Sequence, residues 1–138
     1  MKIELEPEYK PSDKEEYMNP KHLEYFKQKL LAWKQELIAE AQETMSHLKE
    51  EKLNEPDPGD RAMAETDTAF ELRSRDRYRK LINKIDYALE KIESKEYGYC
   101  EETGEPIGLG RLEARPIATL CIEAQEKHEN FERQHSED

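Results

Sequence analysis

Residues 23–48 read LEYFKQKLLAWKQELIAEAQETMSHL, and this stretch decides the fold. Its apolar side chains recur every three or four residues: Leu23, Phe26, Leu30, Trp33, Leu37, Ala41, Met45 and Leu48. That spacing places one apolar stripe along a helix, as in a coiled coil. Asn19 suits the N-cap and Pro20 the first helical position, so we expect the helix to begin there. The run NEPDPG at 54–59 ends it, because its prolines and glycine break a helix.

A second apolar stripe follows the turn. It consists of Phe70, Tyr78, Leu81, Ile82, Ile85, Leu89 and Ile92, and it ends before Tyr97-Gly98. An antiparallel fold-back aligns large apolar residues: Met45 with Phe70, Leu37 with Tyr78, Trp33 with Ile82, Leu30 with Ile85, Phe26 with Leu89 and Leu23 with Ile92. Such a hairpin would be roughly 50 Å long at about 1.5 Å per residue. Two separate amphipathic helices in a compact bundle are the alternative.

The composition favours long helices over a compact globule. Hydrophobic residues make up 35% of the 138 residues and charged residues 40%. A net charge of −11 disfavours direct binding to DNA or RNA. No apolar run reaches the roughly 20 residues of a membrane helix, and the N-terminus lacks the features of a secretory signal. With two cysteines, the sequence predicts a cytoplasmic protein that keeps its thiols reduced, a monomer without membrane contact.

Three segments follow from these patterns. Residues 1–18 contain Pro7 and Pro11 and show no period, so we expect a mobile or loosely docked arm. Residues 19–95 form the hairpin, with its tip at 56–62. Residues 96–138 form a zinc-finger-like segment, followed by a final helix from Pro116 to about Gln134. The predicted fold is therefore mainly α: a long antiparallel coiled-coil hairpin on a small zinc-finger-like globular body with a C-terminal helix.

The tip of the hairpin carries two acids, Asp57 and Asp60. Aspartate is common in turns, and Asp60 could simply cap the second helix. The alternative reading is functional, because a long rod has a use only if its tip must reach somewhere. A pair of acids there could place negative charge near a metal or a basic surface inside another protein.

The C-terminal segment has the spacing of a zinc ribbon but half of its ligands. Cys100 and Cys121 each begin a knuckle, whereas Thr103 and Ala124 stand where the second thiolates belong. Structural zinc needs four ligands. His128 lies about 10 Å along a helix from Cys121, and Glu102 or Glu105 would complete only a poor site. We therefore predict no bound zinc, no Cys100–Cys121 disulfide and a segment held by apolar packing.

A search for catalytic groups finds none. The chain lacks a nucleophile with a partnered base, a phosphate-binding glycine loop and a histidine pair at metal spacing. The four histidines, His22, His47, His128 and His135, are scattered, and we expect them at the surface. The sequence therefore predicts a protein that is not an enzyme.

Two sets of motifs point to a known family. The first set is Asp57-Pro-Gly-Asp60-Arg61-Ala62 and Glu71-Leu-Arg-Ser-Arg-Asp-Arg77; the second is Tyr97-Gly-Tyr-Cys100, Ile107-Gly, Arg111-Leu-Glu-Ala-Arg115-Pro116 and Leu120-Cys121. From about Tyr17 to about Lys127 the chain resembles the DksA/TraR family of bacterial RNA polymerase-binding transcription factors. In lacking two of the four cysteines, the chain resembles those family members that dispense with zinc.

The resemblance implies a function. In that family the hairpin enters the secondary channel of RNA polymerase, and its acidic tip acts near the active centre to destabilise promoter open complexes together with guanosine tetraphosphate. Asp57, Asp60 and Ala62 match the tip motif. Leu81, Lys84 and Arg115 match positions that help form the alarmone site against polymerase. Gln125 replaces a lysine that family members often carry, which implies weaker alarmone binding.

Two other functions stay open at this stage. A transcript-cleavage factor of the Gre type also uses acids at a hairpin tip, to hold a catalytic metal, and it would cleave backtracked RNA. A coiled-coil adaptor without polymerase contact would fail to co-purify with polymerase.

Overall fold

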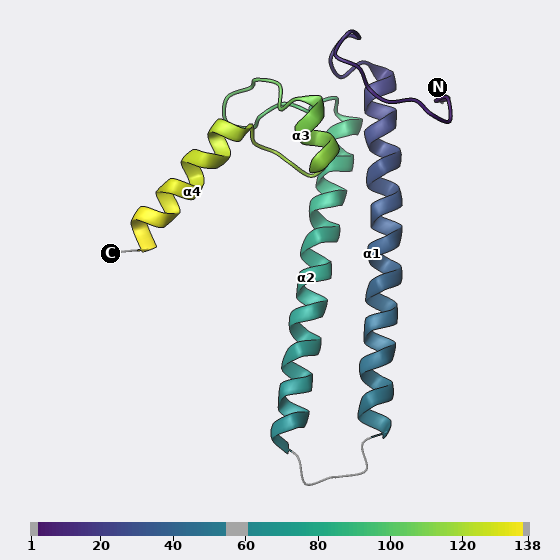
Figure 1. The fold of residues 1–138 in the computed structure, drawn as a ribbon, viewed down its shortest axis with the longest axis vertical. Helices are drawn as coiled ribbons and strands as arrows, with labels where there is room; N and C mark the ends of the chain where they lie inside the picture. The colour runs from purple at the N-terminus through teal and green to yellow at the C-terminus, as the bar shows by residue number, and fades with distance from the viewer. Residues whose placement is uncertain (1–2, 55–60, 137–138) are drawn as a thin grey trace. The chain divides into compact units, whose positions relative to one another are not determined.

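The computed structural model describes residues 3–54 and 61–136. This part of the chain is mainly helical, as predicted, with α1 at Pro20–Asn54, α2 at Arg61–Glu93, α3 at Leu109–Ala114 and α4 at Ile122–Ser136. α1 and α2 run antiparallel and form the predicted hairpin (Figure 1). Within the described ranges the β pairing is one isolated bridge, between Tyr99 and Pro106. None of the described helices combines the length and apolar character that a membrane crossing requires.

The chain divides into two compact units. The hairpin unit is Leu31–Asp86, and the body unit joins Met1–Leu30 to Tyr87–Asp138. The long helices α1 and α2 contribute residues to both units, so each unit contains its own α1–α2 contacts.

In the hairpin unit, Leu37 of the first stripe and Ile85 of the second are buried. The predicted register is wrong. It sets Lys34 opposite Leu81, but the Lys34 ammonium pairs with Asp86 at 2.7 Å. The reason is that stripes with a three-to-four-residue repeat fit several registers differing by about a turn. The polar groups beside the seam select one of them.

Two further contacts in the hairpin unit agree with this shift, in which each α1 residue meets an α2 residue of higher number than its predicted partner. Thr44 and Tyr78 bring their hydroxyl oxygens to 3.4 Å, and Arg75 Nε lies 3.4 Å from the Met45 sulfur. The predicted partner of Met45, Phe70, is instead 47% exposed. The side chains of each helix lean toward its own N-terminus, which accounts for part of the offset.

The first turn of α1 follows the prediction. The Asn19 carboxamide oxygen accepts hydrogen bonds from the backbone N–H groups of Lys21 at 2.8 Å and His22 at 3.1 Å. Asn19 is thus an N-cap that satisfies two of the donors left free at a helix start. Pro20 occupies the first helical position, where its missing N–H costs nothing.

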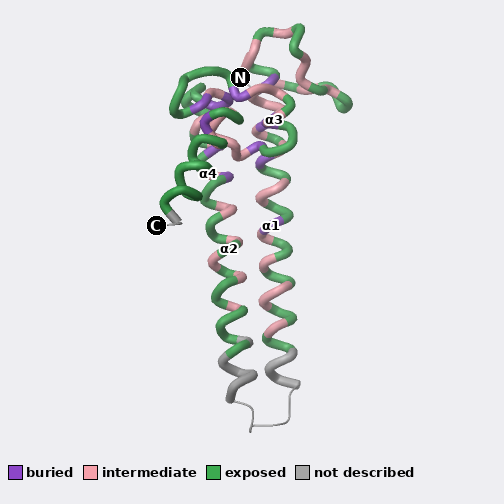
Figure 2. Tube along the Cα trace, turned by 60° about the vertical axis from the view of Figure 1, so that its left-hand side comes forward, coloured by how far each residue is buried: buried purple, intermediate pink, exposed green. Residues whose placement is uncertain are grey.

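Most of the described residues that are buried belong to the body unit (Figure 2). Its buried apolar residues are Phe26, Leu30, Ala88, Ile92, Tyr97, Cys100, Ile107, Leu112 and Ala124. The Phe26 and Tyr97 rings lie 5.6 Å apart between centroids, and the Tyr97 hydroxyl donates to the Pro116 carbonyl oxygen at 2.7 Å. This core joins α1 and α2 to the zinc-finger-like segment through apolar side chains and the Tyr97 hydrogen bond.

The C-terminal helices differ from the prediction. Pro116 does not begin a helix; α3 lies before it and α4 begins later, at Ile122. Arg115 at the end of α3 has φ −142° and ψ 84°, because a residue that precedes proline is driven out of the helical region. Pro116 therefore ends one short helix and lies in a buried turn before the next.

The arm lies against the body. The Tyr17 hydroxyl donates to the Gly98 carbonyl oxygen at 2.6 Å and accepts from the Gly108 N–H at 3.0 Å. The rings of Tyr17 and Tyr99 meet edge to face at 5.5 Å. Tyr9, nearer the N-terminus, contacts Tyr25 of α1 edge to face, with 6.2 Å between the ring centroids. Aromatic contacts of this kind add to the energy of burial alone.

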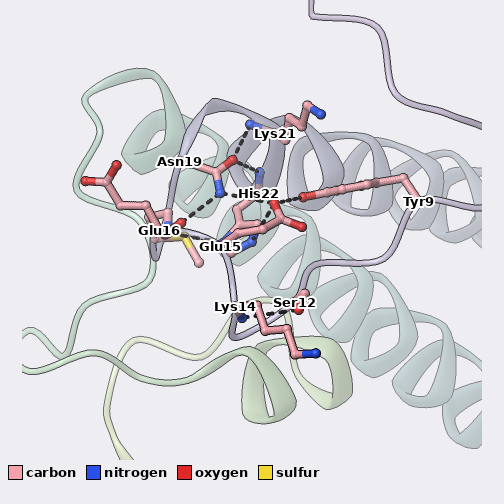
Figure 3. Close-up of polar contacts among 9 residues, drawn as sticks. Tyr9, Ser12, Lys14, Glu15, Glu16, Asn19, Lys21 and His22 are labelled. Atoms are coloured by element: carbon pink, nitrogen blue, oxygen red, sulfur yellow. Dashed lines mark hydrogen bonds and ion pairs between the residues drawn. The ribbon is translucent and has the colours of Figure 1, made fainter.

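The expectation that all four histidines lie at the surface is wrong for His22. Its side chain is fully buried, although His22 lies in the first turn of α1, three residues after the N-cap Asn19 (Figure 3). The signal was present in the sequence, because His22 precedes Phe26 by one helical turn and so lies on the buried stripe.

Candidate functional site

The predicted tip falls mostly outside the described residues. Asp57 and Asp60 lie in the undescribed stretch between α1 and α2. Ala62 belongs to the first turn of α2, but its side chain is among those not described. The assignment of these residues as the polymerase contact therefore stays a prediction.

A shallow pocket of about 440 Å³ lies on α2 in the hairpin unit. Its lining residues are Arg73, Asp76, Arg77, Lys80, Leu81 and Lys84. The structure thus brings the two predicted alarmone residues of this helix, Leu81 and Lys84, into one pocket. We name this set the basic groove.

The basic groove owes its charge to helical spacing. Its four cations follow one another at steps of four, three and four residues, which places them on one face of α2. All four are exposed, whereas Leu81 is half-buried. Sequence reasoning selected Lys84 and missed Arg73, Arg77 and Lys80, although the dense basic run 73–80 was a visible signal. A concentrated positive face of this kind, on a chain of net charge −11, attracts negatively charged groups.

One acid tempers the groove. Asp76 binds Arg79 at 2.6 Å and Lys80 at 3.0 Å. The hydrogen bond from Lys80, followed by the positive charges of Lys80 and Arg79, lowers the pKa of Asp76, so it stays ionised. It neutralises part of the positive charge at one edge of the groove and fixes Lys80 in place.

The third alarmone candidate lies in the other unit. Arg115 is exposed at the C-terminal end of α3, and its backbone N–H donates to the Arg111 carbonyl oxygen at 2.7 Å. Gln125 lies in α4 and donates its carboxamide N–H to Glu129 at 3.3 Å. The position that the family resemblance assigns to a lysine therefore carries an amide engaged with an acid.

The zinc-finger-like segment keeps the backbone of a knuckle. The Cys100 N–H donates to the Glu105 carbonyl oxygen at 2.8 Å, and the Gly104 N–H donates to the Cys100 carbonyl oxygen at 2.9 Å. Gly104 has φ +75°, a left-handed conformation that glycine adopts without strain. The turn between Cys100 and Gly104 is thus closed by backbone bonds.

The side chains of the knuckles do not fit zinc. The Thr103 hydroxyl lies 4.0 Å from the Cys121 sulfur, and Ala124 contributes a buried methyl group. Among the residues described, no cluster of three or more histidine, cysteine or acidic side chains could hold a metal. Two thiols, a neutral hydroxyl and a methyl group do not make the four-ligand set of a structural zinc site.

Both cysteines are free thiols, as predicted, and one of them has an unusual environment. Burial raises the pKa of Cys100, but hydrogen bonds from the Thr103 hydroxyl and the backbone N–H groups of Cys121, Thr103 and Glu102 outweigh it and lower this pKa to about 6. These donors surround the sulfur as they would a metal-bound thiolate. The knuckle therefore stabilises a negative sulfur through hydrogen bonds.

A further contact ties α4 to the first knuckle. His128 Nε2 is in close contact with the Glu102 carboxylate. The hydrogen bond to Glu102 and its negative charge raise the pKa of His128. The sequence predicts that His128 is too far from Cys121 to share a metal, and in the structure His128 contacts Glu102.

Comparison with known proteins decides the family. A family model for the N-terminal domain of the DnaK suppressor protein DksA matches residues 22–92, and one for the prokaryotic DksA/TraR C4-type zinc finger matches residues 95–130. The chain is 63% identical over 131 residues to the RNA polymerase-binding transcription factor DksA of Caulobacter vibrioides, covering 95% of this chain and 92% of that protein. The chain belongs to the DksA family.

Two other relatives support the assignment. The RNA polymerase-binding transcription factor DksA of Escherichia coli K12 is 47% identical over 130 residues, with 94% of this chain and 85% of that protein covered. The solved structure of the transcription factor DksA2 from Pseudomonas aeruginosa is 44% identical and superposes with a TM-score of 0.76 over 85% of this chain and 90% of that one. The name of the second family model specifies a C4-type zinc finger, but this member has only two of the four cysteines.

Proposed function

We propose that the protein is a non-enzymatic regulator of transcription that binds RNA polymerase. The observation that carries this proposal is its 63% identity, over 95% of the chain, to a protein named for that activity. The absence of a catalytic constellation in the sequence agrees with it. As a polymerase-binding factor it acts in the cytoplasm, as a monomer, and its negative charge directs it to the enzyme rather than to DNA.

The hairpin would enter the secondary channel of polymerase. α1 has 35 residues and α2 has 33, so each helix is roughly 50 Å long at about 1.5 Å per residue. That length supports a role in which the tip segment 56–62 acts far from the body. Asp57 and Asp60 would place negative charge near the active centre, with Ala62 beside them, and so destabilise promoter open complexes.

Guanosine tetraphosphate would act as an effector at the polymerase interface. The basic groove offers Lys84 and neighbouring cations to phosphate oxygens, with Leu81 as an apolar neighbour. Charge-assisted hydrogen bonds of this kind are the strong ones in phosphate recognition. The family resemblance assigns Arg115 to the alarmone site as a further cation, whereas Gln125 stands where family members often carry a lysine. This composition favours an alarmone response weaker than that of a relative with lysine at that position.

Binding assays with core RNA polymerase would test both parts. We expect the purified protein to co-purify with polymerase and Lys84→Ala to reduce the response to guanosine tetraphosphate. Lys49→Ala removes the same charge from an exposed position of α1 outside the groove, and it should leave the response unchanged. Failure to co-purify would support the adaptor alternative. Cleavage of backtracked RNA on addition of the protein would support the transcript-cleavage alternative.

A further inference from the structure

We propose that Cys100 and Cys121 form a two-thiolate site for a soft monovalent cation, Cu(I). The site lies in the zinc-finger-like segment of the body unit, and it does not depend on polymerase binding. It differs from the C4-type finger of the family model in its metal and in its number of ligands. The segment folds without the cation, which binds to thiols that the fold has already brought together.

The two sulfur atoms lie around one hydroxyl group. Thr103 donates its hydroxyl hydrogen to the Cys100 sulfur, and its oxygen lies 4.0 Å from the Cys121 sulfur. The backbone N–H of Cys121 also donates to the Cys100 sulfur, so the residue that carries one thiol contacts the other thiol directly. Both cysteines are free thiols. The two knuckles therefore bring both thiols to the same place, although they lack the second pair of cysteines.

The first knuckle holds the Cys100 thiol in a fixed position. Backbone hydrogen bonds close its turn, from the Cys100 N–H to the Glu105 carbonyl oxygen and from the Gly104 N–H to the Cys100 carbonyl oxygen. From the same turn, the backbone N–H groups of Glu102 and Thr103 donate to the sulfur. Such donors stabilise the negative charge of a metal-bound sulfur and orient the ligand before the metal arrives. Little further ordering is therefore needed when a cation binds.

A cation can reach this site from solvent. Cys100 is buried, whereas Cys121 is half-buried and Thr103 is exposed. An entering cation thus meets the Cys121 thiol first. Rotation of the exposed Thr103 side chain about its Cα–Cβ bond, between ordinary rotamers, then removes the hydroxyl group from between the two sulfurs. Entry therefore requires one side-chain movement at the surface and no opening of the body core.

The number and kind of ligands select the cation. Thiolates prefer soft metals, and hard divalent cations such as Mg²⁺ and Ca²⁺ prefer oxygen. Structural zinc needs four ligands. In the described part of the chain, no cluster of three or more histidine, cysteine or acidic side chains could hold a metal. Cu(I) is soft, and its single charge and filled d shell allow a pair of thiolates to complete its coordination. A site with two sulfurs therefore favours Cu(I) over zinc.

Binding is a ligand exchange without electron transfer. At each cysteine an S–H bond breaks and an S–Cu bond forms in its place. The two protons pass to the solvent, and the copper remains Cu(I) throughout. Two thiolates and one monovalent cation leave a single negative charge on the site. The hydrogen bonds that the Cys100 sulfur accepts stabilise this charge.

Competition with a coloured chelator tests the site. The full-length chain, reduced and kept free of oxygen, is titrated with Cu(I) held by bicinchoninate, whose colour reports the Cu(I) that it retains. We expect the protein to withdraw one Cu(I) per chain and to remain monomeric on gel filtration. X-ray absorption at the copper edge should then show two sulfur neighbours for each copper. Failure to withdraw Cu(I), a copper-linked dimer, or nitrogen or oxygen neighbours at the copper would overturn the proposal.

Variants identify the ligands. Cys100→Ser and Cys121→Ser should each weaken Cu(I) binding by at least about 100-fold, since loss of an outer-shell partner alone costs about 10–100-fold. Cys121 is half-buried, so its variant is the one expected to keep the fold, which circular dichroism checks. His128→Gln removes an exposed imidazole beside Glu102 and should bind Cu(I) like the parent. Parental affinity in folded Cys121→Ser, or an equal loss in His128→Gln, would contradict the assignment to the two thiols.

Discussion

The hydroxyl of Tyr17 donates a hydrogen bond to the carbonyl oxygen of Gly98 at 2.6 Å. The same hydroxyl accepts from the N–H of Gly108 at 3.0 Å. One phenol from the arm therefore links Gly98 and Gly108, which lie on either side of the first knuckle. The zinc-finger-like segment lacks a fitting set of zinc ligands, so we expect this bridge to stabilise the conformation of the knuckle.

Tyr17→Phe removes the bridge and keeps the ring. We expect it to lower the free energy of unfolding by about 1–3 kcal/mol, because the part-buried Gly108 N–H loses its partner, while the Gly98 carbonyl oxygen keeps only its hydrogen bond from the Ile107 N–H. Tyr87→Phe is the matched control, since the Tyr87 phenol is exposed and binds the Glu101 side chain. That change should stay within about 0.5 kcal/mol. Urea unfolding measures both, and equal effects would argue against a structural role for the bridge.

Leu37→Ala tests the seam of the hairpin. Leu37 is 6% exposed, and truncation of a buried leucine typically costs about 2–5 kcal/mol. Leu72→Ala is the control, because Leu72 is 61% exposed on α2 and should change stability by no more than about 0.5 kcal/mol. A loss from Leu37→Ala as small as that from Leu72→Ala would show that the seam does not stabilise the hairpin unit.

The helices of the hairpin could be predicted from the sequence, and their register could not. Apolar spacing and the Asn19-Pro20 start located α1, and Pro56 and Pro58 located its end. The register depended on contacts such as Lys34 with Asp86, which a repeating apolar stripe does not encode. Side-chain reach and polar pairing decide it, and both need coordinates.

The candidate site was predictable in the same uneven way. Motif positions identified Leu81 and Lys84, which the structure places in one pocket. The other cations of the basic groove follow from helical geometry once α2 is known. His22 was missed because histidine is usually a surface residue, whereas here the Asn19 turn and the arm enclose it.

Zinc dependence gives a further prediction. A chelator should leave the melting temperature unchanged, and metal analysis should find far less than one zinc per chain, because a true structural zinc contributes its binding energy to folding. Changing Thr103 and Ala124 to cysteine together would restore four thiols at knuckle spacing and should produce stoichiometric zinc. Stoichiometric zinc in the unmodified protein, with unfolding on chelation, would refute the metal-free account.

The pair formed by His128 and Glu102 predicts a pH dependence. The pKa of His128 is raised in the folded protein. The pair therefore stabilises the folded state fully at pH values below the ordinary histidine pKa of about 6.5, and this stabilisation is lost as the pH rises through the raised pKa. Glu102→Gln should lower the pKa of His128, as followed by NMR of the ring protons. An identical titration in the variant would mean that Glu102 is not the cause.

The lifetime of promoter open complexes is the measurement that tests the proposed function most directly. The unmodified protein should bind RNA polymerase and shorten that lifetime. Asp57→Asn together with Asp60→Asn should bind nearly as well and have no effect on it, because the proposed function assigns the two acids to the active centre rather than to docking. An unmodified protein that leaves the lifetime unchanged would contradict the account, as would a double variant that shortens it like the parent or loses binding and effect to the same degree.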